Sequence, residues 1–202
     1  YFNEPPSERT VAKVISTDES IFCLMICYNQ KGVINKYTGT HDNFNGDIVS
    51  FMIDTFNDKK TAYKFAVSAS GAKADVRLLD DSRNRDFSWD GIWFADSKVY
   101  SWGYVVEMEI PYKSIQYEES LEFWGLDFDR WIPSKNEDLY WCEYEQNEGQ
   151  RISKFGKLIF NDFKPNAKGL NLEVYPVGIA KSEYIREGVY DSDFDIGFDI
   201  LY

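Results

Sequence analysis

The sequence predicts an all-β fold, a two-layer antiparallel β-sandwich of the jelly-roll type. The main observation is a run of three strands between Asp47 and Asp81, separated by the polar turns 57–60 and 70–71. Aromatic residues, which pack well on pleated sheets, make up 17% of the chain. A meander with one apolar face needs a second sheet to cover it, and 202 residues are enough for both layers.

Alternating residues in the meander indicate which side of each strand faces the core. We expect the following residues of its second and third strands to face inward: Tyr63, Phe65, Val67 and Ala69, then Ala74, Val76 and Leu78. Asp75 and Arg77 are therefore expected to face solvent.

The remaining segments supply strands for the second layer. Ser20–Tyr28 is apolar on both faces, as in the middle of a sheet, and Pro111–Tyr117 begins with the proline typical of a first helical turn. On the longest strand, Trp124 shares the core face with Arg130. The other predicted strands are Thr10–Thr17, Gly91–Tyr100, Gly103–Ile110, Leu121–Ile132, Leu139–Tyr144 and Lys154–Phe160.

Charge and residue usage exclude several classes of protein. The formal net charge is −12, with no basic stripe, so we expect no nucleic-acid partner. The chain has one histidine, His41, and no hydrolase, metalloprotease or nucleotide-binding motif, so we predict that it is not an enzyme. Cys23 and Cys27 are too far apart along one strand to bond to each other. Either pairs with Cys142, or all three are buried thiols.

Two clusters of oxygen ligands make Ca²⁺ the one cofactor that we consider, although none is required. A hard cation needs several oxygens from neighbouring carboxylates and carbonyls. The two clusters are Asp54, Asn57 and Asp58 in one turn, and Asp80, Asp81 and Asp86 in one loop. The alternative is ordinary turn chemistry, in which these carboxylates accept backbone hydrogen bonds.

The runs ERTVAKV, IDTFNDKKTAYKFAVSASG, SWDGIWFADSKV, GYVVEMEIPYKSIQY, WGLDFDRWIPSKNEDLYW and SKFGKL together resemble the family 9 carbohydrate-binding module. They are most similar to the version that precedes a β-barrel of unknown function in bacterial outer-membrane proteins. The resemblance implies a non-catalytic sugar-binding sandwich over residues 1–162. One departure is Ser68, where such modules often carry an asparagine that can contact sugar.

A sugar site needs flat aromatic faces and polar groups for the hydroxyls. The candidate carbohydrate-binding residues are Trp89, Trp93, Arg130, Trp131 and Trp141, with Phe44 and Trp102 as further aromatic candidates. The alternative for each tryptophan is a place in the core.

The tail, residues 163–202, is expected to be a linker and the start of a C-terminal β-barrel. Phe194–Tyr202 alternates strictly between apolar and polar residues over a length that suits a lipid-facing strand. An amphipathic sandwich strand has the same period. The resemblance places the protein at the bacterial outer membrane, on its cell-surface or periplasmic face, and we expect the chain to continue past Tyr202. The alternative function is a docking domain that caps the barrel without binding sugar.

Overall fold

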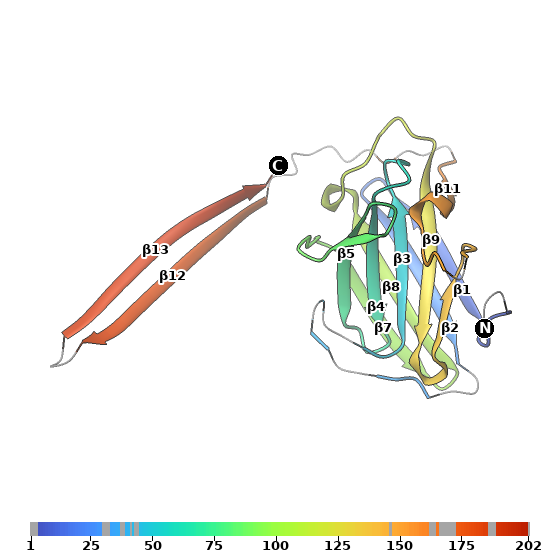
Figure 1. Ribbon diagram of the computed structural model, residues 1–202, viewed down its shortest axis with the longest axis horizontal. Coiled ribbons are helices and arrows are strands. Elements are labelled where there is room, and N and C mark those ends of the chain that lie inside the picture. The colour runs from blue at the N-terminus through green and yellow to red at the C-terminus, as the bar shows by residue number, and fades with distance from the viewer. Residues whose placement is uncertain are drawn as a thin grey trace. The chain divides into compact units, whose positions relative to one another are not determined.

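The computed structural model describes residues 4–29, 33–36, 39–40, 42, 45–145, 147–161, 165, 173–185 and 189–201 (Figure 1). The chain divides into two compact units, Tyr1–Ala167 and Lys168–Tyr202. Within the described ranges there is no α-helix, and no helical segment is long and apolar enough to cross a membrane. The all-β sandwich predicted from the sequence is confirmed.

The first sheet has four antiparallel strands in the order β1-β2-β8-β7. Strand β2 is central because it is apolar on both faces, and β7 and β8 form a tight hairpin (Figure 1). The strands are β1 (Thr10–Ser16), β2 (Ser20–Tyr28), β7 (Phe94–Tyr100) and β8 (Gly103–Pro111).

The second sheet is larger and contains the predicted meander, in the order β10-β9-β3-β4-β5-β6. Strand β11 continues the β10 edge by pairing with the first half of β9. The strands are β3 (Ile48–Asp54), β4 (Ala62–Ser68), β5 (Lys73–Leu79), β6 (Asn84–Asp86), β9 (Phe123–Ile132), β10 (Glu137–Tyr140) and β11 (Gly156–Ile159). The 3-10 turns are η1 (Tyr112–Ser114), η2 (Pro133–Lys135) and η3 (Ile152–Lys154), and η1 replaces the longer turn expected after Pro111.

The main core lies between the two sheets. Its largest buried side chains come from both layers, including Met25 of β2, Phe51 of β3 and Phe65 of β4. Trp124 of β9 is 1% exposed, as its position on the strand predicts. Burying such side chains provides most of the stability of the sandwich.

The prediction of which β5 side chains face the core is wrong. Val76 pairs with Lys64 and Asp75 pairs with Phe65, so Asp75 and Arg77 share the core side while Ala74, Val76 and Leu78 face outward. The outward face is dry because η3 covers it: Met52, Ala62, Val76, Leu78 and Ile152 form a second apolar cluster. Both sides of the large sheet therefore carry apolar residues.

All three cysteines are free thiols. Cys23 and Cys27 are both buried on the core face of β2, four residues apart, and Cys142 is half-buried two residues after β10. The disulfide alternatives with Cys142 are not formed.

The second unit is an antiparallel hairpin of β12 (Glu173–Ile185) and β13 (Val189–Leu201). In its register Phe198 lies opposite Pro176, Ile196 opposite Gly178 and Phe194 opposite Ala180. These six residues share one face, and the three large side chains are 63–67% exposed. This face is apolar from Pro176 to Ala180, and beyond Ala180 it carries Ser182.

Candidate functional site

The edge of the large sheet at β9 and β10 is hollowed into a cleft of about 980 Å³. The N-terminal segment Glu4–Glu8 lies along it, Ala12 of β1 and Met25 of β2 line it from the small sheet, and residues 128–130 and 135–142 line it from the large one. We call this space the edge cleft. Its volume is in the range of small-ligand sites, about 300–1,000 Å³.

Trp141 provides an open aromatic face in the edge cleft. Its side chain is 58% exposed, although it packs edge-on against Phe128 at 5.8 Å between ring centroids. Its backbone N–H donates to the carbonyl of Phe128 at 3.0 Å, which fixes the chain where β10 ends. The indole lies on Gly156, where a Cβ atom would come within 2.4 Å of the ring. The ring is therefore held by the backbone, with its other face open.

Two tyrosines line the edge cleft with Trp141, of which Tyr144 is buried and Tyr140 is exposed. Tyr140 is 39% exposed and packs edge-on against Tyr144 at 5.3 Å. The Tyr140 hydroxyl donates to the Asp138 carboxylate at 2.6 Å, and partial burial together with that carboxylate raises the pKa of Tyr140. Tyr140 remains a neutral phenol at any physiological pH.

Asp127 fixes the segment that follows Trp141. This carboxylate is fully buried and accepts hydrogen bonds from the Tyr144 hydroxyl at 2.6 Å, the Gln150 amide at 3.0 Å and the Cys142 backbone N–H at 3.0 Å. Burial raises the pKa of Asp127, and the three donors oppose that rise. The loop is thereby attached to the rigid strand β9.

The opposite rim of the edge cleft is charged. The Lys135 ammonium donates to Glu8 at 2.7 Å and to the Ser7 hydroxyl at 2.9 Å. The Ser7 backbone N–H donates to the Glu137 carboxylate at 2.9 Å. These contacts hold the N-terminal segment along the cleft and place ionised groups beside the aromatic surface.

Arg130 lines the inner end of the cleft but is 1% exposed. Its guanidinium donates to the Thr10 hydroxyl and to the carbonyl of Tyr28, both at 3.0 Å, and lies 5.4 Å from the ring centre of Tyr104. Its Nε is buried with no partner among the described residues. Arg130 therefore links β9 to β1 and β2 of the small sheet.

The structure brings together Arg130 and Trp141 among the predicted binding residues. Trp93 is 1% exposed in the core, and Trp89 packs on Tyr63 at 4.7 Å between ring centroids. Trp131 is half-buried on the outer face of β9. Tyr140 and Tyr144 were not among the sequence candidates, because nothing local shows that they line a cleft with Trp141 and the N-terminal segment.

The further candidates lie away from the edge cleft. Trp102 is 38% exposed and stacks on Tyr100 at 5.1 Å in the β7–β8 turn. Phe44 and His41 lie outside the described residues. The Ser68 hydroxyl is buried and bonds to Ser70 at 2.8 Å within its own turn.

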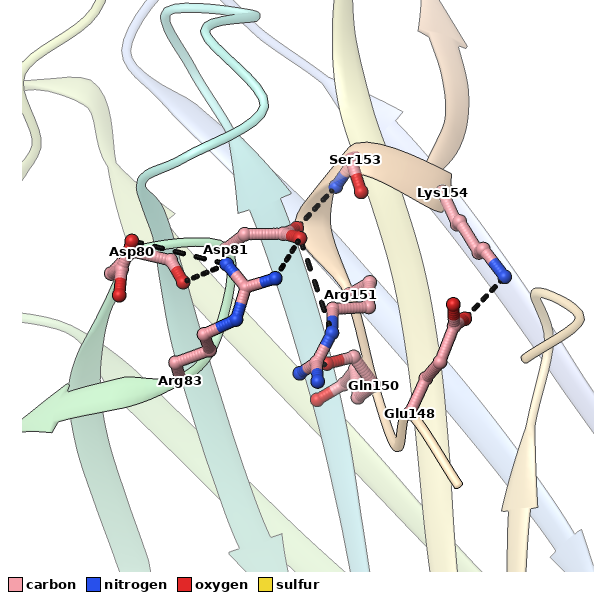
Figure 2. A network of polar contacts seen from close by, with 8 residues as sticks. All are labelled: Asp80, Asp81, Arg83, Glu148, Gln150, Arg151, Ser153 and Lys154. Carbon is pink, nitrogen blue, oxygen red and sulfur yellow. Dashed lines mark hydrogen bonds and ion pairs between the residues drawn. The ribbon is translucent and has the colours of Figure 1, made fainter. Parts of the chain in front are cut away.

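The carboxylates considered for Ca²⁺ bond to protein donors. Asp54 accepts the backbone N–H groups of residues 56, 58 and 59. Figure 2 shows Asp81 among Arg83, Arg151 and the backbone N–H of Ser153, which it accepts at 2.8 Å. Over the described part of the chain, no group of three or more histidine, cysteine or acidic side chains is placed to hold a metal ion.

The fold has known counterparts among solved structures. No protein-family model and no curated protein matches the chain. A family 9 carbohydrate-binding module from Caldicellulosiruptor kristjanssonii in complex with glucose is similar, with a TM-score of 0.57 and 16% identity over 84% of this chain and 83% of that one. The same kind of module with cellotriose gives 0.57 and 16%, covering 82% and 80%. A candidate carbohydrate-binding protein from Bacteroides uniformis gives 0.60 and 15%, covering 76% and 79%.

Proposed function

We propose that the sandwich is a non-catalytic carbohydrate-binding module whose site is the edge cleft. The observation that carries the proposal is the Trp141 indole, which packs against Gly156, is 58% exposed and lines the cleft. An indole face suits the C–H side of a pyranose ring. The similar folds crystallised with glucose and cellotriose support the same ligand class.

The polar residues of the cleft suit the hydroxyl groups of a stacked sugar. Glu137 and Asp138 offer carboxylate oxygens as acceptors, and Lys135 offers an ammonium group as donor. Charged partners make stronger hydrogen bonds to hydroxyls than neutral ones do. Arg130 would not contact the sugar, and would support the inner end of the cleft through its bonds to Thr10 and Tyr28.

The carboxylates beside the cleft support binding without catalysis. A glycosidase needs two carboxyl groups free to face the scissile bond. Asp127 is enclosed by three donors, and Asp129 is 8% exposed and paired with Lys64. Both oxygens of Asp127 accept protein hydrogen bonds, and one oxygen of Asp129 is held by Lys64.

Titration calorimetry with glucose, cellotriose and a wider panel of oligosaccharides tests the proposal. We expect heat with at least one sugar, and its loss in Trp141→Ala. Trp102→Ala is the matched control, since Trp102 is also exposed but lines no part of the cleft. If no sugar binds to the folded protein, or if Trp102→Ala weakens binding as much as Trp141→Ala, the edge cleft is not the site.

We also propose that the β12–β13 hairpin begins an outer-membrane barrel, which would place the module at that membrane. The support is the hairpin face formed by Phe194, Ile196 and Phe198, which suits lipid. Deleting residues 170–202 should leave the melting temperature of the sandwich nearly unchanged. A fall of many degrees would contradict the barrel. A soluble, stable sandwich that binds no sugar would favour the docking role.

A further inference from the structure

We propose that the outer face of the small sheet binds a second copy of this chain and so forms a two-fold symmetric dimer. The proposal does not depend on sugar binding, because this face lies on the other side of β1 and β2 from the edge cleft. The cleft is lined by Ala12 and Met25, whose side chains lie on the core side of those strands. The starting observation is that β2 is apolar on both faces, whereas the core covers only one of them.

The uncovered side of β2 belongs to an apolar patch that reaches all four strands. The odd-numbered residues from 21 to 27 pack in the main core, so Phe22, Leu24 and Ile26 face away from it. Among the described residues, none of these three belongs to either apolar cluster. Together with their neighbours on this face they form what we call the outer patch: Val11, Ile15, Phe22, Leu24, Ile26, Phe94 and Val105. Large exposed apolar patches mark interaction sites.

The charges on the outer face are separated by strand. Lys13 of β1 is paired in the sheet register with Leu24 of β2, which is paired in turn with Glu107 of β8. Glu107 is paired with Asp96 of β7, so the four residues form one row across the sheet. Lys13, Glu107 and Asp96 are all exposed. The row therefore has its cation at one edge of the sheet and its two anions toward the other.

A two-fold axis parallel to the strands, midway between β2 and β8, makes this face complementary to itself. It stacks two copies face to face, with β1 of one copy over β7 of its partner. Lys13 then meets the partner's Asp96, and the dimer contains this pair twice. In the neighbouring row Ile15, which is 65% exposed, meets the partner's Phe94, which is 58% exposed. An axis across the strands would instead place β1 over β1 and bring like charges together.

The size of the face predicts a weak dimer. Four strands about 4.8 Å apart, each about eight residues long at about 3.3 Å per residue, cover about 500 Å². The two copies together would bury about 1,000 Å², which is the lower end for specific interfaces. We therefore expect a dissociation constant of roughly 10 μM, so that the dimer forms as the protein is concentrated.

Sedimentation equilibrium of the full chain, at concentrations from about 1 to about 300 μM, tests the proposal. The variants are Lys13→Glu and Asp96→Lys, both at exposed positions of the outer face, where neither change disturbs the core. Lys60→Glu is the matched control, because Lys60 is an exposed lysine in the turn between β3 and β4 of the large sheet. Circular dichroism melts check that every variant is folded.

We expect wild type and Lys60→Glu to dimerise alike, and each of the other two variants to lose at least about tenfold in affinity, because like charges then meet twice in the dimer. An equal mixture of Lys13→Glu and Asp96→Lys should dimerise again, since both contacts between the two chains then join opposite charges.

Three results would overturn the proposal. The first is a wild type that stays monomeric at every concentration, which would leave the outer patch to a different protein. The second is association that neither charge reversal weakens, as expected if the chains meet through the β12–β13 hairpin. The third is a mixture of the two variants that fails to recover the dimer. None of these results bears on the proposed sugar site, which calorimetry tests separately.

Discussion

Replacing Asp54 by alanine should destabilise the sandwich strongly. Asp54 ends β3, is 1% exposed, and its carboxylate accepts N–H groups from Phe56 at 3.3 Å, Asp58 at 3.3 Å and Lys59 at 2.9 Å. The turn places Asn57 and Lys59 at positive φ, 49° and 59°, which non-glycine residues rarely adopt. The carboxylate therefore holds a strained turn closed.

The magnitude follows from the three donors that lose their acceptor. A net hydrogen bond contributes about 0.5–1.5 kcal/mol, so we expect a loss of about 3 kcal/mol. For a domain of this size each kcal/mol lowers the melting temperature by about 2–4 °C, which predicts a fall of about 6–12 °C. Asp54→Asn keeps one acceptor oxygen and should lose less.

The loss of stability is measured by thermal and urea unfolding of four proteins: wild type, the two Asp54 variants and Asp18→Ala. Asp18 is exposed in another turn, so its replacement should change little. The same melts with added Ca²⁺ check whether the turn binds the ion. An Asp54→Ala midpoint within 2 °C of wild type would refute the reasoning, and a calcium-dependent rise lost in this variant would assign the carboxylate to the metal.

Three further outcomes follow from the same structure. Gly103→Ala should prevent normal folding, because its Cβ would lie 2.0 Å from the carbonyl oxygen of Cys27, and circular dichroism at increasing temperature measures the loss. Gly156→Ala should move the Trp141 ring, lowering sugar affinity with little change in melting temperature. Burial raises the pKa of Asp127 above its usual 3.8, so the stability that it contributes is fully present below 3.8 and is lost as the pH rises through the folded pKa. The difference in unfolding free energy between wild type and Asp127→Asn should therefore shift in favour of wild type on acidification, and a pH-independent difference would contradict this.

Local alternation was enough to predict the sandwich and most of its strands, since a period of two is imposed by the strand itself. It failed at β5 because Val76 and Leu78 are covered by Ile152, which is remote in sequence. The alternation along a strand shows which residues share a face of the sheet, but it does not show which face is covered by other parts of the chain. That depends on where a distant loop packs.

The candidate site was harder to predict for the same reason. Trp93 and Trp141 look alike in sequence, yet the first is 1% exposed and the second 58%. The difference arises because Trp93, just before β7, packs edge-on against Phe65 in the core, whereas Trp141 follows β10 at the edge of the large sheet. The edge cleft joins residues 4–8 to residues 135–141, a separation that no local pattern encodes.

The β12–β13 hairpin has consequences for how the protein behaves at high concentration. Each strand is 13 residues long and pairs with the other alone within the described residues, so the outer edges carry unpaired N–H and C=O groups. Long exposed edges next to Phe194, Ile196 and Phe198 are templates for strand addition. In aqueous buffer the purified chain is therefore prone to aggregate through this hairpin, and mild detergent that coats the aromatic face should keep it dispersed.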